Sequence, residues 1–578
     1  PVPTIRGKIF RRPKGASVHV EYQYDRVYNP EKQYNVPKRT VIGKVCKTDT
    51  SRMFPNERYL EFFPDTVIPE VRPDAYRSCC LRIGSYLVIN KVINEYQLAP
   101  MLKRWLGTDC GLLLDLVSFS IITEDNAGMH YPDFAYCHPL FSDHMRIYSD
   151  SSVSRMLNSL TSDQRIGFLN AWNAQRDHRQ RIYVSYDSTN KNCQAGDVEF
   201  VEFGKAKDDK GFPVFNLALA FDKTNKVPLF YEEYPGSIND VSQFSFMVDK
   251  VHEYGYRRIG FILDRGYFSK DNIRYMDDEH YDFIIMVKGM KKLVSNLVKR
   301  KRGSFETLRD CSIRPYRVYG TTVKQKLFAD DEHDRWFHIY HNPGREAAER
   351  EQLEIQLDRQ NTFFAKLEGK KIEFSAACSQ YFDLFHDAEG IFLYARENKQ
   401  AIQEALKLCG YFVIVSSAKM TAKDALVLYK SRDSLEKLFS GDKTFLGSKS
   451  MRVHSQESLS AKIFIEFIAL IIRNRIYTLL REEVLSLELK RNFMIVPAAL
   501  RELEKIEMVR RGDGQYRLDH AVTKTQKTIL RAFGLSEADV LQQATEIGKL
   551  LEQSSSLLNI LRDDGGDDDG TEEDDFIC

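Results

Sequence analysis

One block of the sequence, from Ile182 to Val287, constrains the fold of this chain more than any other part. Five stretches with strand-like composition follow one another in it, at 182–186, 214–221, 227–231, 258–263 and 281–287. Helical spacing separates the last three of these stretches, at 239–254 and 270–279. The block therefore predicts three strands joined by hairpins, then a helix, a strand, a helix and a strand, which is an α/β arrangement around one mixed sheet.

An aspartate directly follows two of the predicted strands, Asp187 after the first and Asp264 after the fourth. A charge at the end of a hydrophobic strand costs free energy unless it binds something. Either aspartate alone would be interpreted as a helix cap or a turn residue. Together, on a mixed sheet of the ribonuclease-H type, they are candidate metal ligands.

The segment 424–443 carries a tyrosine, an arginine and a glutamate at helical spacing. Tyr429, Arg432 and Glu436 would lie on one face of a helix, with Lys443 further along. A solvated charged face alternates Glu and Lys freely, whereas here one acid lies between groups that bind phosphate. We expect the helix to present Glu436 to the two strand-end aspartates.

Three carboxylates around an open position suit Mg²⁺ or Mn²⁺, which accept water and phosphate oxygens as further ligands. Two such ions about 3.5 to 4 Å apart can activate an attacking oxygen and stabilise a leaving oxygen. The predicted reaction is in-line cleavage or transfer of a phosphodiester. The planar guanidinium of Arg432 and the compact ammonium group of Lys443 would hold the phosphates of the DNA backbone near the metal site.

Basic residues elsewhere in the chain suggest further contacts with DNA. The helix predicted at 149–160 leaves Arg155 on its outer face. Two interpretations are open: this helix enters the major groove of DNA as a recognition helix, or it is an ordinary amphipathic helix. The basic, strand-rich residues 1–90 are compatible with a solvated surface and with a DNA contact. The densest basic run predicts a cationic helix at 288–302 that would track phosphates and that contains Lys291, Lys292, Lys299 and Arg300.

The bulk composition agrees with a DNA partner and excludes several other classes. Segment 563–578 holds nine acids and no base, so the net charge of +1 becomes +10 without it. Ten cysteines without a C-x-x-C pair predict reduced thiols. The most apolar segment, 463–472, is short and interrupted by Glu466, so no membrane contact is expected. Segment 203–211 lacks the Gly-Lys-Ser/Thr ending of a P-loop, so no nucleotide cofactor is expected.

Changes of pattern along the chain predict seven regions. The catalytic core has a first part at 179–302 and a second part at 416–481, separated by a β-rich insertion at 303–415. The four other regions are a small β-rich basic region at 1–90, a helical region at 91–178 with a possible DNA-binding role, a helical region at 482–561 for DNA-end binding or dimerisation, and a disordered acidic tail at 562–578.

The residues singled out above resemble the DDE transposases of bacterial and archaeal insertion sequences, specifically the insertion-sequence-four superfamily. That superfamily carries a Tyr, Arg, Glu, Lys motif with two, three and six residues between its members. Tyr429, Arg432, Glu436 and Lys443 meet this spacing in full, and Asp187 and Asp264 match the two aspartates of the family. Gly266 and Tyr267 follow the second aspartate, as the family pattern requires. The resemblance covers about residues 180 to 480.

The resemblance implies a DNA transposase that cleaves at the terminal inverted repeats of its element and joins the 3′-OH ends to target DNA. It also implies a homodimer on double-stranded DNA, in the cytoplasm of a prokaryote and associated with its nucleoid. Some members stack a flipped base on an aromatic residue of the insertion, for which Trp336 and Phe412 are candidates. Two other functions remain open: a ribonuclease-H-like nuclease that cuts without joining, and a domesticated DNA-binding protein with a silent core.

Overall fold

The computed structural model of the chain describes residues 2–14, 17–30, 33–45, 50–51, 53–64, 66, 77–193, 198, 200–202, 213–238, 240–375, 378–432, 446, 450–451, 453, 455–486, 492–512 and 514–557. The chain divides into two units, one formed by residues 169–441 and the other by 1–168 with 442–578. The unit of residues 169–441, which we call the sheet unit, contains Asp187 and Asp264. We call the other the helical unit.

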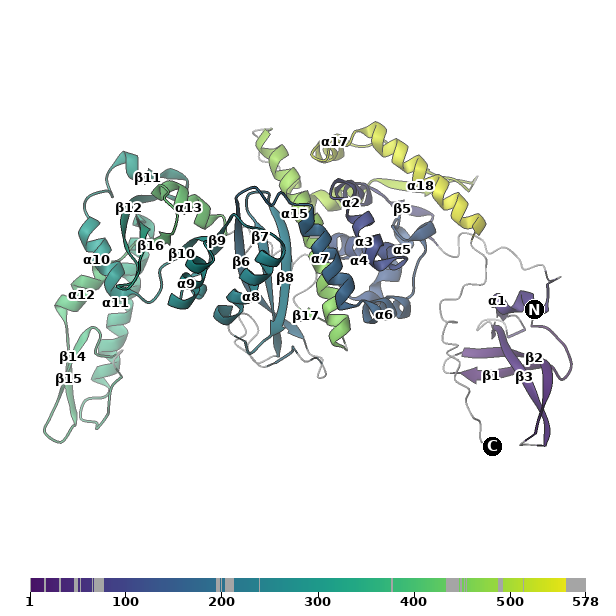
Figure 1. The fold of residues 1–578 in the computed structure, drawn as a ribbon, viewed down its shortest axis with the longest axis horizontal. Helices are drawn as coiled ribbons and strands as arrows, with labels where there is room; N and C mark the ends of the chain where they lie inside the picture. Colours follow the sequence, from purple (N-terminus) through teal and green to yellow (C-terminus); the bar gives the residue numbers. More distant parts are fainter. Residues whose placement is uncertain are drawn as a thin grey trace. The chain divides into compact units, whose positions relative to one another are not determined.

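A mixed sheet forms the centre of the sheet unit (Figure 1), and one half of it has the predicted strands. The strand order in this half is β8-β7-β6-β9-β10, in which β6, β7 and β8 are antiparallel while β6, β9 and β10 run parallel. All nine residues of β7 are buried, as expected for a strand covered on both faces. The predicted mixed sheet is confirmed, and the bounds of its five strands are β6 Ile182–Cys193, β7 Val214–Asp222, β8 Val227–Pro235, β9 Ile259–Leu263 and β10 Asp282–Met286.

Four more strands extend the same sheet beyond β10, in the order β16-β13-β12-β11. The sequence at 303–415 supplies β11, β12 and β13, so this stretch adds strands to the central sheet as well as elements outside it. The strands pair antiparallel, and β16 joins them to β10. Their bounds are β11 Ser312–Ile313, β12 Val318–Lys326, β13 Asp334–His341 and β16 Tyr411–Ser416.

Helices cover both faces of this sheet. On one face Phe244 of α8 packs edge-on against Phe261 of β9, with ring centroids 5.7 Å apart. On the other face α13 buries Ala425 and Leu426 against a cluster that includes Ile262. The helices of this unit are α8 Asp240–Glu253, α9 Lys270–Asp278, α10 Lys291–Lys301, α11 Pro343–Ala365, α12 Lys399–Leu406 and α13 Ala422–Lys430.

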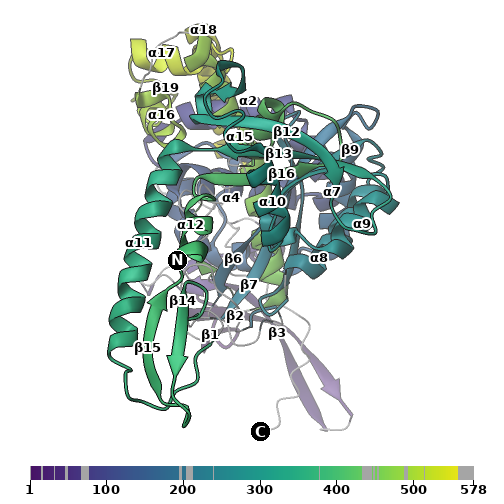
Figure 2. The same ribbon diagram turned by 90° about the vertical axis from the view of Figure 1, so that its left-hand side faces the viewer.

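The elements α11, β14, β15 and α12 form a lobe with its own hydrophobic core. The antiparallel pair β14 (Phe382–His386) and β15 (Phe392–Glu397) lies beside α11 in both views (Figures 1 and 2). Phe364 of α11 packs edge-on against Phe382 at 5.0 Å, which fixes the hairpin on the helix.

The helical unit is built around the long helix α15, in which nineteen residues are buried. It packs against α2, α4 and α6. A three-stranded sheet in the order β19-β18-β5 pairs residues 80–82 with the chain's last third. The bounds are β5 Cys80–Arg82, α2 Gly84–Glu95, α3 Leu98–Leu106, α4 Asp109–Thr123, α5 Tyr131–Cys137, α6 Asp150–Ser159, β17 Ser450–Met451, α15 Gln456–Ser486, α16 Val496–Leu503, β18 Glu507–Arg510, β19 Tyr516–Leu518, α17 Lys524–Arg531 and α18 Glu537–Leu557.

The first 66 residues contain a four-stranded antiparallel sheet in the order β1-β2-β3-β4, on which α1 packs. The bounds are β1 Ile9–Lys14, β2 Ser17–Asn29, β3 Tyr34–Val45, β4 Met53–Pro55 and α1 Glu57–Phe62. A further helix, α7 (Ser162–Ala174), contains the boundary between the two units. None of the helices in the described ranges has an apolar stretch long enough to cross a membrane.

Candidate active site

The register of β6 against β9 brings the two candidate aspartates together. These strands run parallel, and their last paired residues are Tyr186 and Leu263. Asp187 and Asp264 each come one residue later, so they leave neighbouring strands at the same level of the sheet. Adjacent strands are about 4.8 Å apart, which places both carboxylates within reach of one ion.

One part of the strand prediction is wrong: β6 does not end at Asp187 but continues to Cys193. Its second half stays in the sheet because it pairs with β7, from Asp187 opposite Leu219 to Asn192 opposite Val214. Asp187 is therefore held in the middle of a long strand. The neighbouring strand β9 ends one residue before Asp264, at the same level.

Both aspartates lie on the face of the sheet that α13 covers. Side chains alternate along a strand, so Asp187 shares a face with Tyr183, and Asp264 shares a face with Ile262. Tyr183 and Ile262 both pack in the cluster beneath α13. The helix runs across this face and ends near the carboxylates.

Asp264 caps a short 3₁₀ helix, η4 (Arg265–Tyr267), by accepting a hydrogen bond from the backbone N–H of Gly266 at 3.4 Å. Its other carboxylate oxygen, Oδ1, accepts a hydrogen bond from Nη1 of Arg432. The side chain of Asp264 is 36% exposed and that of Arg432 is 15% exposed. One carboxylate oxygen of Asp264 therefore caps the 3₁₀ helix and the other binds Arg432, while the side chain remains partly exposed to solvent.

Tyr429 and Arg432 lie together at the end of α13, as the predicted spacing requires. The Arg432 guanidinium is 5.3 Å from the centre of the Tyr429 ring, and its Nη1 is 3.3 Å from the phenol oxygen. Tyr429 is buried. The sequence predicted both residues as DNA contacts and missed the pairing of Arg432 with Asp264, because only the fold shows which acid lies opposite the arginine.

The predicted helix of 424–443 differs from the observed one, because α13 ends at Lys430. The backbone N–H of Arg432 bonds to the carbonyl of Tyr429, and the hydroxyl of Ser431 bonds to the carbonyl of Leu428 at 2.6 Å. These i→i+3 bonds tighten the chain into a turn, and Arg432 lies in that turn. Glu436 and Lys443 lie outside the described residues. Within the described part of the chain, no cluster of three or more His, Cys, Asp or Glu side chains could hold a metal ion.

The sequence missed an anchor that fixes the other end of α13. The hydroxyl of Tyr340, on β13, donates a hydrogen bond to the carbonyl of Ala422 at 2.7 Å. Thr421 caps the same helix by accepting from the N–H of Asp424 at 3.1 Å. A tyrosine in a sheet strand gives no sequence signal for such a role, because buried strand tyrosines usually serve as core.

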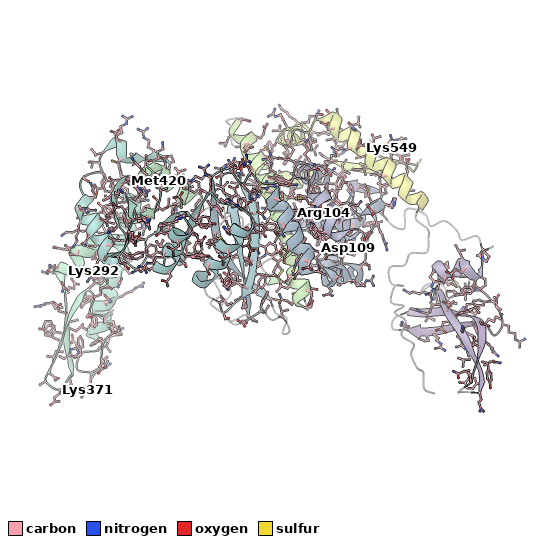
Figure 3. The ribbon with its side chains drawn as sticks, viewed as in Figure 1. Arg104, Asp109, Lys292, Lys371, Met420 and Lys549 are labelled. Atoms are coloured by element: carbon pink, nitrogen blue, oxygen red, sulfur yellow. The ribbon has the colours of Figure 1, made fainter. Side chains whose placement is uncertain are left out.

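The basic residues predicted along 288–302 lie on α10 and are partly used within the protein. Lys299 forms an ion pair with Glu404, and the hydrogen bonds from Lys299 and Lys407 lower the pKa of Glu404 to about 2. Arg300 donates to the side-chain oxygen of Gln325 at 2.8 Å. Lys292 is exposed (Figure 3), and the side chain of Lys291 lies outside the described part.

Two other predicted features are placed by the structure. The amphipathic helix at 149–160 is α6, with Val153 and Met156 buried and Arg155 exposed near Ser152, whose hydroxyl accepts from Arg155 Nη2 at 3.1 Å. Of the two candidate aromatics, Phe412 lies at the start of β16, stacked on Tyr340 at 4.9 Å. Trp336 lies near the start of β13, opposite Ser416, and the register through β16 and β10 places it level with Ile262 of β9, three strands away.

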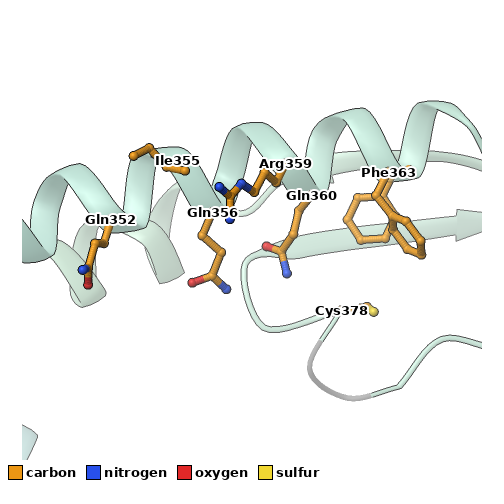
Figure 4. A pocket seen from close by; sticks show the side chains of 8 residues that line it. Gln352, Ile355, Gln356, Arg359, Gln360, Phe363 and Cys378 are labelled. Carbon is orange, nitrogen blue, oxygen red and sulfur yellow. The ribbon is translucent and has the colours of Figure 1, made fainter.

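Two cavities of the sheet unit are not lined by the candidate carboxylates. One, of about 600 Å³, runs along α11 beside Phe363 and Cys378 (Figure 4). The other, of about 460 Å³, opens beside α13 between Lys223 and Lys419. Asp187 and Asp264 lie instead at the level of the sheet where β9 ends, outside both cavities.

Comparison with known proteins identifies the family of the chain. The model of the family described as "Transposase DDE domain" matches residues 184–472, which is half of the chain and includes Asp187, Asp264 and Arg432. The chain therefore belongs to the family of transposase DDE domains, and the resemblance inferred from the sequence is confirmed at that level.

A solved structure of piggyBac transposase, in a synaptic complex with hairpin DNA, is similar to the chain at 12% sequence identity with a TM-score of 0.32. The match covers 77% of this chain and 70% of that one. No curated protein matches the chain.

Proposed function

We propose that this transposase cleaves phosphodiester bonds at the terminal inverted repeats of an insertion sequence and joins the resulting 3′-OH ends to target DNA. The observation that carries the proposal is the placing of Asp187 and Asp264 at one level of two parallel strands, with Arg432 bonded to Asp264. A pair of carboxylates with an adjacent guanidinium provides metal ligands and a phosphate-binding group in one place.

The strand order β8-β7-β6-β9-β10 supports a ribonuclease-H-like core. In such a core the two carboxylates come from neighbouring strands and a third from a later helix. Glu436 is our candidate for the third ligand, since it follows Arg432 in the spacing of the Tyr-Arg-Glu-Lys motif. Lys443 completes that motif as a second phosphate contact.

The residues present fit divalent ions such as Mg²⁺ or Mn²⁺, and we propose two of them. Asp187 and Asp264 are hard oxygen donors, and Asp264 remains partly exposed. When bound, a pair of such ions supplies activation of the attacking oxygen and neutralises charge on the leaving oxygen. The two aspartates would hold the ions, and Arg432 would orient Asp264 and bind the phosphate that is cut.

Other parts of the proposal concern the partners and the setting. We propose double-stranded DNA as the substrate, bound as two ends by a homodimer, with contacts from Lys292, Arg155 and the α10 surface. The division into seven regions rests on changes of pattern along the sequence. The origin in a bacterial or archaeal insertion sequence, with action at the nucleoid, rests on the resemblance of the sequence.

A cleavage assay with end-bearing duplex DNA and Mg²⁺ tests the proposal. Asp187→Asn and Asp264→Asn should each abolish cutting, while Asp330→Asn, which changes an exposed carboxylate of the same unit, should not. Cutting at the wild-type rate by either active-site variant would refute it. A second assay, with pre-cleaved 3′-OH ends, measures whether these ends are joined to target DNA. Cutting without joining would instead identify a nuclease.

A further inference from the structure

The N-terminal sheet contains a two-stranded ribbon that extends beyond its neighbours. Strand β1 pairs with β2 only from Ser17 to Tyr22, and β4 pairs with β3 only from Gly43 to Val45. The rest of the hairpin, residues 25–29 with 34–38, pairs with no third strand among the described residues. Figures 1 and 2 draw these strands in purple. We call this part the ribbon.

Large side chains of the ribbon are exposed to an unusual degree. Val27 is 42% exposed, Tyr28 59% and Tyr34 57%. Tyr24, at the base, packs on the sheet's own helix, with its ring 5.4 Å from that of Phe62. A two-stranded hairpin without a covered face is marginally stable by itself, so a partner that covers these side chains would stabilise it.

The two faces of the ribbon carry groups that can read or hold a nucleic acid. The register places Asp25 opposite Lys38 and Asn29 opposite Tyr34 on one face. Tyr28 lies opposite Asn35 on the other face, next to Arg26. Arginine and asparagine are the side chains that form paired hydrogen bonds with guanine and adenine edges, and lysine binds phosphate.

The net charge of residues 1–66 indicates what kind of partner the ribbon binds. Residues 1–66 contain thirteen Lys and Arg but seven Asp and Glu. Exposed cations continue from the ribbon to the base of the sheet, where Arg11 and Lys14 lie on β1. A region of this charge attracts a polyanion, and two copies of it would repel each other.

We propose that the ribbon is a DNA-binding arm that enters a groove of duplex DNA, with Arg26 and Lys38 contacting the DNA. The major groove of B-DNA is wide enough to admit a two-stranded β-ribbon. A protein interface would be expected to exclude charge from its centre, whereas the ribbon carries charged side chains between its tyrosines. The inference rests on the proposed function only in taking DNA as the substrate class, and it does not depend on the carboxylates.

The test is the affinity of the full chain for a mixed-sequence duplex, measured by fluorescence anisotropy in EDTA at several salt concentrations. The double variant Arg26→Ala/Lys38→Ala should bind at least about tenfold more weakly. Its plot of log affinity against log salt should also become shallower, by about one unit for each phosphate that the variant no longer neutralises. Because no divalent ion is present, weaker binding here is separate from a failure of cleavage at Asp187 and Asp264.

Two matched variants control for charge and for folding. Asp25→Asn raises the charge of the ribbon and should bind as tightly as the wild type or tighter, whereas Lys549→Ala, an exposed lysine on α18 (Figure 3), should bind like the wild type. Circular dichroism should be unchanged in all variants, since the side chains are exposed. Wild-type affinity in the double variant would overturn the proposal, and so would a failure of the wild type to bind duplex at low salt. A change of oligomeric state with unchanged affinity would identify a protein interface instead.

Discussion

Arg432 donates a hydrogen bond from Nη1 to Oδ1 of Asp264, although the two residues are 168 positions apart in the sequence. The pair joins the end of α13 to the end of β9. It places a guanidinium against the carboxylate that we propose as a metal ligand, and it fixes the direction of that carboxylate. Arg432 therefore acts on the site through Asp264 as well as through any phosphate it binds.

Replacing Arg432 should reduce DNA cleavage without removing metal binding. Arg432→Ala removes a charge-assisted hydrogen bond worth about 1.5–3 kcal/mol, so cutting of end-bearing DNA in Mg²⁺ should slow by roughly 10- to 100-fold. Arg432→Lys keeps the charge but lacks the planar fork, and it should recover only part of the rate. Mn²⁺ affinity should stay equal or increase, because the guanidinium competes for Oδ1.

The control for Arg432 is another Arg–Asp pair of the same unit. Arg274 pairs with Asp330, and both side chains are about half exposed. Arg274→Ala should leave the cleavage rate unchanged, because exposed ion pairs contribute little. An equal decrease of rate in the Arg274 and Arg432 variants would contradict a specific role for Arg432.

A methyl group at Gly320 should disturb the packing of α13 against the sheet. A Cβ there would lie 2.9 Å from two ring carbons of Tyr340 and 3.1 Å from the Cβ of Ala422. Gly320→Ala should lower the free energy of unfolding by about 1–3 kcal/mol and slow cleavage, because α13 shifts and with it the turn that holds Arg432. Chemical denaturation and the cleavage assay measure the two effects.

Gly344→Ala provides the matched control for that substitution. Its Cβ would meet only the side-chain oxygen of Asn342, at 3.5 Å, in the first turn of α11. This variant should be as stable as the wild type or more stable. Equal stability of the two variants would show that the space around Tyr340 is not restrictive.

The central sheet could be predicted because its signals are local. Strands such as Ile259–Leu263 are short, wholly buried apolar runs, and the helices between them have clear periodicity. The continuation of β6 beyond Asp187 could not be predicted, since residues 188–192 are polar and their pairing with β7 has no local signal. The sequence also did not predict that β12 and β13 belong to the same sheet. Their place in it depends on the pairing of β13 with β16, which is distant in the sequence.

Sequence patterns selected the candidate residues of the site but gave no information on their contacts. Strand-end position selected Asp187 and Asp264, and helical spacing selected Tyr429 and Arg432. The register of β6 against β9, which brings the aspartates level, depends on which strands pair and has no local signal. The helix α13 ends at Lys430 because i→i+3 hydrogen bonds tighten the chain at Arg432. The sequence pattern does not predict these bonds.

The helical unit should lose stability as the pH rises from about 4 to about 7. Asp115 is wholly buried, and desolvation raises its pKa to about 7 despite hydrogen bonds from the backbone N–H groups of Phe141 and Ser142. Between about pH 4 and 7 the folded form keeps a proton that the unfolded form has released, so stability falls with rising pH by up to about 1.4 kcal/mol per unit. Asp115→Asn should remove this slope in thermal unfolding at pH 5 and 8. An identical slope in the variant would contradict the assignment.

The sheet unit should show the opposite dependence in acid. His338 is buried in β13, where Thr322 Oγ1 lies 2.9 Å from Nδ1 and Ser416 Oγ lies 3.0 Å from Nε2. Burial lowers its pKa from the usual 6.5 to about 4, so the unfolded form takes up a proton first as the pH falls. Stability should decrease between about pH 6.5 and 4. His338→Gln should reduce this decrease in urea denaturation, and an unchanged decrease would argue against it.

Binding of Mn²⁺ to the full chain, measured by isothermal titration calorimetry, tests most directly the claim that Asp187 and Asp264 form one metal site. Asp187→Asn and Asp264→Asn should each weaken binding by at least about tenfold, and the double variant should bind little more weakly than either single one, because both remove ligands of the same site. Wild-type affinity in both single variants would contradict the claim.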